Sequence, residues 1–146
     1  MHAYILKESD SELRVAASPE STKKMVEMGL SVSVQTTAGD KSNFSDESYA
    51  ASGAEIFENT TDIANADIVI KVNKPTNEEI SSMKDGALFI GSLDPYNSNE
   101  TISNLKEKGV TSFAMELMPR ITRAQSMDIL SSQSNLAGYK AVIDAT

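Results

Sequence analysis

The sequence has 146 residues, of which 40% are hydrophobic, and it contains no cysteine. A chain of this length can bury one substantial core, so we expect a single domain. The formal charge of −8 at pH 7 argues against nucleic acid or an anionic lipid surface as a partner, because like charges repel. Disulfides and thiolate metal sites are excluded, and the single histidine, His2, stands at what we expect to be a flexible terminus, so no metal site is expected.

Neither a membrane span nor an export signal is visible in the sequence. No run of apolar residues approaches the roughly 20 that cross a bilayer. The first residues, MHAYILKESD, lack the charged and apolar regions of a signal peptide. We therefore expect a soluble chain that is neither exported nor inserted directly into a membrane.

Apolar runs alternate with helix-period segments over most of the chain. The first helix, for example, has Ser18 as a cap, Pro19 in its first turn and Gly29 at its end. In chain order, the pattern predicts strand 3–6, polar loop 7–13, helix 18–29, strand 31–35, helix 46–52, strand 55–57, helix 61–64, strand 67–72, helix 77–84, strand 87–92, helix 98–109 and strand 111–117.

The strands DIVIKV (67–72) and ALFIGS (87–92) are apolar along most of their length instead of alternating between apolar and polar residues. Such strands are typical of a parallel sheet that is covered on both faces. The regular succession of strand and helix favours the same architecture. The sequence therefore predicts an α/β protein with a doubly wound, mostly parallel sheet and helices on both of its faces.

The last segment, residues 124–146, keeps a helical period and has no stop signal. Because natural domains seldom finish inside a helix, we interpret the chain as a truncated polypeptide, with one unit over residues 1–123 and the start of a connecting helix over 124–146. Gly138 weakens such a helix by up to about 1 kcal/mol, so we expect close backbone packing at this position.

The most informative stretch of the sequence is ELMPRITRAQSMDILSSQSNLAGYKAVID, residues 116–144. It contains Arg120, Gln125, Asp128 and Ser131. The stretch closely resembles the loop after the last strand of the N-terminal subdomain in the NAD-binding component of proton-translocating transhydrogenases, down to the spacing PRI.RAQS.D.LSS.

Two further stretches carry the same resemblance. Residues 7–19, with Lys7-Glu8, Glu12, Arg14-Val15-Ala16 and Ser18-Pro19, are similar to an opening that transhydrogenases share with alanine dehydrogenases, and ADIVIKVNKP (66–75) is a third match. Together with the helices between them, the three stretches cover essentially the whole chain. The resemblance implies a flavodoxin-like (Rossmann-like) fold, with residues 124–146 leading to a missing dinucleotide-binding domain.

Acid–base residues separate the two branches of this family. In alanine dehydrogenases, the resemblance implies that the keto acid is held by an arginine that matches Arg14, a lysine that matches Asn73 and a histidine that falls near Leu93. Reductive amination needs a cation for the carboxylate and a group that exchanges a proton, whereas hydride transfer between two nicotinamide rings needs only positioning. The sequence thus favours a transhydrogenase. The role of Arg14 stays open, and we expect Lys71 and Lys74 to be solvated.

The resemblance also implies roles for four polar residues. Arg120, Asp128 and Ser131 would fix the carboxamide and ribose of bound NAD(H), while Gln125 would reach toward NADP(H) on a partner domain. An arginine and an aspartate eight positions apart can form a charge-assisted pair that locks the loop. Without the resemblance, Arg120 and Asp128 would be a surface salt bridge, and Gln125 and Ser131 would be solvated or capping residues.

No G-x-G-x-x-G follows a strand, so the chain has no evident cradle for a pyrophosphate, and we expect the 146 residues alone to be inactive and to bind NADH weakly or not at all. The resemblance implies that the cradle lies in a missing Rossmann domain of the same subunit. It also implies an NADP-binding domain, a membrane domain and a second copy as partners. The chain would be a soluble peripheral domain on the cytoplasmic or matrix side of an inner membrane. Two alternatives stay open: an amino-acid dehydrogenase of the alanine type, and a non-catalytic interaction module that docks through the tail helix.

Overall fold

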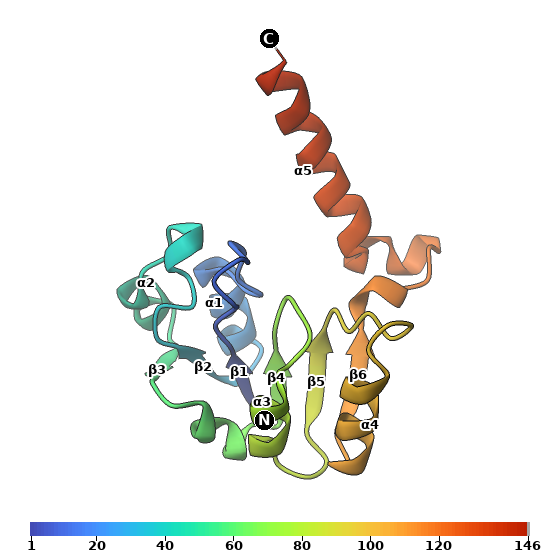
Figure 1. Ribbon diagram of the computed structural model, residues 1–146. Helices are drawn as coiled ribbons and strands as arrows, with labels where there is room; N and C mark the ends of the chain where they lie inside the picture. The colour runs from blue at the N-terminus through green and yellow to red at the C-terminus, as the bar shows by residue number, and fades with distance from the viewer. Residues whose placement is uncertain (146) are drawn as a thin grey trace.

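Six parallel strands form the sheet at the centre of the computed structural model, which describes residues 1–145 (Figure 1). In chain order they are β1 (His2–Ile5), β2 (Ser31–Gln35), β3 (Glu55–Phe57), β4 (Ile68–Ile70), β5 (Leu88–Gly91) and β6 (Thr111–Ala114). Their order across the sheet is β3-β2-β1-β4-β5-β6, and every neighbouring pair is parallel. The predicted doubly wound parallel sheet is therefore confirmed. Its strand order is the Rossmann order and not the flavodoxin order.

Helices and short 3-10 turns connect the strands. The helices are α1 (Pro19–Glu27), α2 (Asp46–Ala51), α3 (Asn77–Ser82), α4 (Asn99–Glu107) and α5 (Ile129–Asp144), and the 3-10 turns are η1 (Asp40–Ser42), η2 (Thr60–Asn65), η3 (Met115–Leu117) and η4 (Thr122–Met127). The first two helices belong with one core cluster, and η2, α3 and α4 belong with the other, so both faces of the sheet carry helices.

Local sequence signals account for the ends of α1 and α3. The Ser18 hydroxyl accepts a hydrogen bond from the Ser21 amide at 3.2 Å, Pro19 opens α1, and Gly29 leaves it with a φ of +89°. At α3, Thr76 and Glu79 form a reciprocal capping box. These signals were readable in the sequence, and the helices begin where the signals stand.

Two apolar clusters form the core, one on each face of the sheet. Alternate residues of β1 and the loop after it separate them: Ile5 belongs to the cluster with Val34 and Tyr49, whereas Tyr4 and Leu6 belong to the other. All five side chains are buried. Since β1 lies in the middle of the sheet, the N-terminal strand carries both halves of the core.

One half of one face is covered less well. Ile5 pairs with Ile70, Ile70 with Ile90, and Ile90 with Phe113, so these four residues point to the same face. Ile5 is completely buried under the first half of the chain, but Ile70 and Ile90 are partly exposed and Phe113 is 55% exposed. Within residues 1–145, the face of β4, β5 and β6 thus keeps apolar side chains accessible.

Several predictions about element ends are wrong. The strand expected over 111–117 ends at Ala114, because the chain then turns into η3. The brief helix expected over 61–64 is present as the 3-10 helix η2 and is one residue longer at each end. The tail helix does not run from 124: Asp128 is extended (φ −77°, ψ 98°) and separates η4 from α5. Thr146 lies outside the described residues.

The two ends of the chain also differ from expectation. His2 lies within β1, where its amide donates to Asp67 at 2.7 Å and its Nε2 is 2.8 Å from the Ser33 hydroxyl, so it is not in a flexible terminus. Near the other end, apart from the adjacent residues and backbone of its own helix, no atom lies within 4 Å of the place where a Cβ of Gly138 would stand. The expected close packing at Gly138 is therefore absent from the described part of the chain, where α5 projects away from the sheet (Figure 1).

Candidate functional site

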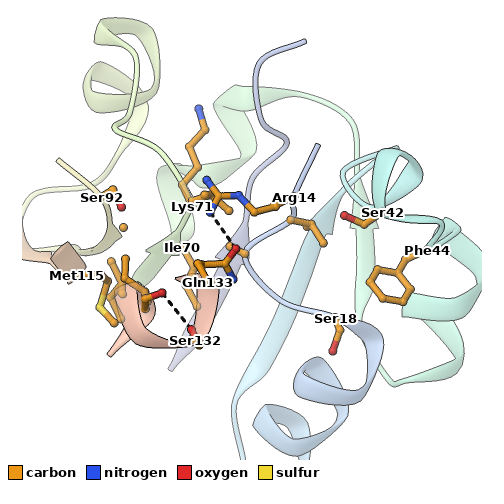
Figure 2. A pocket seen from close by; sticks show the side chains of 16 residues that line it. Arg14, Ser18, Ser42, Phe44, Ile70, Lys71, Ser92, Met115, Ser132 and Gln133 are labelled. Atoms are coloured by element: carbon orange, nitrogen blue, oxygen red, sulfur yellow. Dashed lines mark hydrogen bonds between the residues drawn. The ribbon is translucent and has the colours of Figure 1, made fainter. Parts of the chain in front are cut away.

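A crevice opens where β1 and β4 lie side by side, because the chain builds the sheet outward from this point in both directions. Ligands of open parallel sheets bind at such a point, beyond the carboxyl ends of the strands. A cavity of about 410 Å³ lies here (Figure 2). Its lining comes from the loop between β1 and α1, the carboxyl ends of β4 and β5, residues near α2, and the first turns of α5.

Gly91 permits the close packing of the two strands that floor the cavity. A Cβ at this position would stand 2.6 Å from the carbonyl oxygen of Lys71 and 2.9 Å from the ring of Phe89. A backbone atom cannot yield as a flexible side chain can, so a larger residue would push β5 away from β4.

Lys71 and Glu79 form an ion pair beneath the cavity. The Lys71 ammonium lies 2.8 and 2.9 Å from the two carboxylate oxygens of Glu79, which also accepts from the Thr76 amide at 2.7 Å. Lys71 is only 7% exposed and Glu79 8%. The expectation that Lys71 is solvated is therefore wrong, because the capping box of α3 brings a carboxylate to it. Lys74 is exposed as expected and donates to the Ser98 hydroxyl at 3.0 Å.

The Asn73 amide joins two carboxylates at the rim. Its Nδ2 donates to Glu8 at 3.2 Å and to Glu12 at 3.1 Å. Glu8 also accepts from the Val72 amide at 2.6 Å. Burial raises the pKa of Glu8 above its ordinary value, an effect that the Val72 amide and the charge of Lys71 oppose. An asparagine side chain thus satisfies a pair of carboxylates at the rim of the cavity.

Arg14 holds the second of these carboxylates from the other side. Its Nε and Nη2 donate to the two oxygens of Glu12 at 2.9 and 2.8 Å, the two-pronged geometry that suits a guanidinium. This hydrogen bonding lowers the pKa of Glu12 to about 2. The remaining arm of Arg14, Nη1, donates to the Gln133 side chain of α5 at 3.4 Å (Figure 2).

Asp128 and Ser131, two of the four residues singled out in the sequence, meet at the start of α5. The Asp128 carboxylate accepts from the Leu130 and Ser131 amides at 3.0 and 3.2 Å and from the Ser131 hydroxyl at 2.6 Å. The Ser131 hydroxyl is the main cause of a lowered pKa of Asp128, and the charge of Arg120 is the smallest. The pair therefore forms the N-terminal cap of α5.

Arg120 and Gln125 do not join this pair. Both side chains are exposed, and within residues 1–145 neither takes part in a hydrogen bond or an ion pair. The charge-assisted pair expected between Arg120 and Asp128 does not form within residues 1–145, where the Asp128 oxygens instead accept three local hydrogen bonds at the helix end. The side chains of Arg120 and Gln125 remain accessible to a ligand.

Sequence reasoning missed several residues of the crevice. Ile129, Ser132 and Gln133 of α5 line the cavity, whereas none of the four singled-out residues does. The start of α3 at Asn77 was predicted, and the capping-box spacing of Thr76 and Glu79 agrees with it. Nothing in the sequence could have shown that Glu79 reaches Lys71, since this contact depends on the packing of α3 against β4.

The crevice offers few groups for proton transfer. Lys71 is engaged by Glu79, Glu12 is ionised at neutral pH, and the Tyr49 hydroxyl below the α1 loop donates to the Ala17 carbonyl at 2.7 Å with its pKa raised to about 12 by burial. In residues 1–145, no group of three or more histidine, cysteine, aspartate or glutamate side chains is placed to hold a metal ion. The arrangement suits orientation of a ligand better than acid–base catalysis.

A family model described as "Alanine dehydrogenase/PNT, N-terminal domain" matches residues 4–137. The chain belongs to this family. Its relatives in the family include an NAD(P) transhydrogenase alpha-subunit protein of Rhodospirillum rubrum, which is 45% identical over 139 residues, and the alanine dehydrogenase of Bacillus subtilis, which is 32% identical over 132 residues. These alignments cover 91% and 90% of this chain but only 36% and 34% of the relatives.

A solved transhydrogenase from Sinorhizobium meliloti has the same fold, with a TM-score of 0.94 and 51% sequence identity. The match covers 99% of this chain and 44% of that one. A solved L-alanine dehydrogenase gives a TM-score of 0.75 at 31% identity over 80% of the chain. This family member thus resembles transhydrogenases more closely than alanine dehydrogenases, and it spans about a third to less than half of their length.

Proposed function

We propose that this family member is the N-terminal portion of the NAD-binding component of a proton-translocating transhydrogenase. The complete enzyme would exchange hydride reversibly between NAD(H) and NADP(H). The chemistry of the crevice carries the proposal, because Lys71 is engaged by Glu79 and an asparagine, Asn73, stands at the rim. The higher identity to transhydrogenases supports the same choice.

Hydride exchange is compatible with the lack of a free acid–base pair among the described residues of the crevice. The nicotinamide ring supplies the hydride, and no proton moves at the reacting carbons, so the protein needs to orient the two rings and to exclude water. The sequence has no histidine after His2. An alanine dehydrogenase, by contrast, would have to exchange a proton with its substrate through one of these engaged groups.

The residues at the first strand-to-helix turn fit the ring end of a dinucleotide and not its phosphates. A pyrophosphate normally sits on a glycine-rich turn at the start of the helix. Here the turn between β1 and α1 contains no glycine, and it places the carboxylates of Glu8 and Glu12 at the crevice. Two carboxylates repel a pyrophosphate, so we infer that the phosphate cradle belongs to another domain of the longer protein.

Three residues, Arg120, Asp128 and Ser131, would hold the nicotinamide end of NAD(H), and a fourth, Gln125, would face the partner nucleotide. Asp128 accepts a hydrogen bond from the Ser131 hydroxyl, which leaves the lone pairs of the Ser131 oxygen free to accept from the carboxamide N–H of NAD(H). Arg120, exposed before η4, would donate to the ribose or the carboxamide oxygen. Gln125, exposed on η4, would reach toward NADP(H) on a partner domain. These are binding and orienting roles, and none of them transfers a proton.

The partners of the chain follow from the same proposal. The half-covered face of β4, β5 and β6, with Phe113 accessible, would pack against other parts of the same subunit, including its Rossmann domain. An NADP-binding domain, a membrane domain and a second copy of the subunit would complete the enzyme. No helix within residues 1–145 has the length and apolarity to cross a membrane. The chain would lie on the cytoplasmic or matrix side of that membrane.

The test is hydride transfer by the complete enzyme that carries Gln125→Asn or Asp128→Asn. We expect the transfer rate to fall far more than the affinity for NADH, because both changes disturb orientation and leave most of the nucleotide's contacts intact. Stopped-flow absorbance with a nicotinamide analogue gives the rate, and NADH fluorescence gives the affinity.

Matched controls separate position from chemistry. Ser126→Ala lies on the same 3-10 turn as Gln125, and Asp144→Asn removes a carboxylate at the far end of α5. Both should leave the rate unchanged. Equal losses of rate and affinity in Gln125→Asn and Asp128→Asn would contradict the orienting role. Turnover of pyruvate with ammonia by the unmodified enzyme would favour an amino-acid dehydrogenase instead.

A further inference from the structure

The direction of α5 depends on contacts at its first turns. From Leu130 onward every described residue of the helix is exposed, and Figure 1 shows the helix leaving the carboxyl edge of the sheet. The extended residue Asp128 separates α5 from η4, so the helix is not a rigid continuation of the preceding segment. Only the early residues Ile129, Ser132 and Gln133 line the crevice. The direction of the whole helix α5 therefore depends on these contacts at its start.

A hydrogen bond between two side chains connects α5 to the loop between β1 and α1. Arg14 Nη1 donates to the Gln133 carbonyl oxygen at 3.4 Å, from the opposite wall of the cavity (Figure 2). This hydrogen bond is long, and because its acceptor is neutral it stabilises the contact only modestly. How well it fixes α5 therefore depends on how firmly the Arg14 guanidinium is held.

The guanidinium is held firmly. The Arg14 Nε and Nη2 donate to the Glu12 carboxylate. The same carboxylate accepts from the Asn73 side chain at 3.1 Å, and Asn73 also donates to Glu8. Glu8 ends the series on the Val72 amide at 2.6 Å, immediately after β4. Hydrogen bonds therefore run without interruption from the end of β4 to α5, and Arg14 is the last fixed point before the helix.

We propose that Arg14 is a positioning residue that fixes the direction of α5, and with it the Asp128 cap, by bridging Glu12 to Gln133. This gives a role to an arginine that the hydride reaction does not require. The inference rests on the geometry of α5 and does not depend on the proposed function, because its test measures a distance within the chain.

The absence of cysteine makes that distance measurable. Lys23→Cys on α1 and Ala141→Cys on α5 are both at exposed positions, and they would be the only two thiols in the chain. Spin labels on them give a distance distribution by double electron–electron resonance. We expect one narrow peak in the otherwise unchanged chain, and a broader, shifted distribution with either Arg14→Met or Gln133→Leu.

The double variant and a rescue decide whether the bridge is the cause. Arg14→Met with Gln133→Leu should broaden the distribution no further than either single change. Gln133→Glu gives Arg14 a charged acceptor and should narrow the distance distribution, but only while Arg14 is present. Ser134→Ala, the neighbouring control, should change nothing. Gln133 is exposed, so its variants leave the fold of the sheet unit intact, which circular dichroism verifies. A narrow, unshifted peak in either Arg14→Met or Gln133→Leu would overturn the proposal.

Discussion

Lys71 and Glu79 are two charges that the fold keeps almost entirely out of water beside the crevice. Each makes the other tolerable, since a buried charge without a partner is strongly unfavourable. Gly91 likewise avoids a steric clash between β4 and β5. Asn73 donates hydrogen bonds to the carboxylates of Glu8 and Glu12 just beyond the end of β4. Single substitutions at these positions have effects that the structure specifies.

Lys71→Met should lower the free energy of unfolding by about 3–5 kcal/mol, because it leaves the Glu79 carboxylate buried and unpaired. Adding Glu79→Gln should restore part of the loss, since the amide oxygen can still accept from Thr76. Urea unfolding followed by circular dichroism measures both. Lys74→Met, at the exposed neighbour, should stay within about 0.5 kcal/mol of the unmodified chain. A similar cost at positions 71 and 74 would contradict the buried pair.

Gly91→Ala should cost about 1–3 kcal/mol, because the added Cβ meets the Lys71 carbonyl oxygen. The matched change Gly138→Ala introduces a methyl group into open space within a helix, and it should raise the helix content of α5. The first is measured by urea unfolding and the second by circular dichroism. An unaffected unfolding midpoint in Gly91→Ala would show that β4 and β5 can separate without cost.

Two carboxylates at the rim should respond to pH in opposite directions. The pKa of Glu12 falls from 4.5 to about 2 on folding, so its contribution is present above pH 4.5 and is lost as the pH drops through 2. The pKa of Glu8 is raised, so the folded chain loses stability as the pH rises from 4.5 through that higher value. Glu12→Gln should weaken the dependence of the melting temperature on pH below pH 4.5. Glu8→Gln should weaken this dependence above pH 4.5. Melting followed by circular dichroism over this range tests both signs.

At the scale of the element, α5 begins at a clear cap. Asp128 supplies this cap, and the apolar residues Leu136, Tyr139 and Val142, which are three positions apart and so share one side of the helix, are exposed. An apolar side of a helix is normally buried against another part of a protein. The isolated helix therefore depends on its cap more than a packed helix would.

Asp128→Ala should weaken α5 by about 1 kcal/mol, because two amides at its start lose their acceptor. Asp128→Asn keeps an acceptor there and should preserve the helix while it removes the charge. Amide hydrogen exchange over residues 130–140 reads this difference directly. Equal exchange in the two variants would show that the cap has no role in holding the helix.

Elements with strong local signals could be predicted from the sequence. Ser18, Pro19 and Gly29 delimit α1, and the apolar runs of β4 and β5 indicate a parallel sheet, because each signal acts through its immediate neighbours. The tail could not be predicted as well. A helical period continues through Asp128, but the side chain of this residue caps the next turn and ends the preceding one.

The candidate site was predictable only where residues close in sequence also lie close in space. Asp128 and Ser131 meet because they are one turn apart, whereas the contact of Lys71 with Glu79 and that of Arg14 with Gln133 depend on how separate elements pack. Sequence spacing carries no information about such contacts. The strand order likewise depends on which strand pairs with β1, and it emerges only at the level of the sheet.

At the scale of the whole molecule, the chain carries the crevice, and the residues proposed to hold the nicotinamide ring, but no glycine-rich turn after β1. A glycine-rich turn is what normally receives the pyrophosphate of a dinucleotide. Under the proposed function the molecule would present one wall of a binding site, and its length is about a third of that of its Rhodospirillum rubrum relative.

We expect the 146-residue chain to bind NADH weakly or not at all, for want of a phosphate cradle. Equilibrium titration followed by NADH fluorescence measures this, with the complete subunit as the positive control. Micromolar affinity in the chain alone would show that the crevice at Glu8 and Glu12 accepts a whole dinucleotide.

The position of β1 in the sheet has a consequence for synthesis on the ribosome. This strand precedes the other five in the chain, yet it lies inside the sheet, and its second edge pairs only with β4, where Ala3 meets Ile68. Before β4 is synthesised, that edge of β1 would have no partner, and an unpaired apolar strand edge is the kind of surface from which aggregation starts. Slow translation between β3 and β4 would lengthen this exposure, and the yield of folded protein should therefore depend on the codons in that interval.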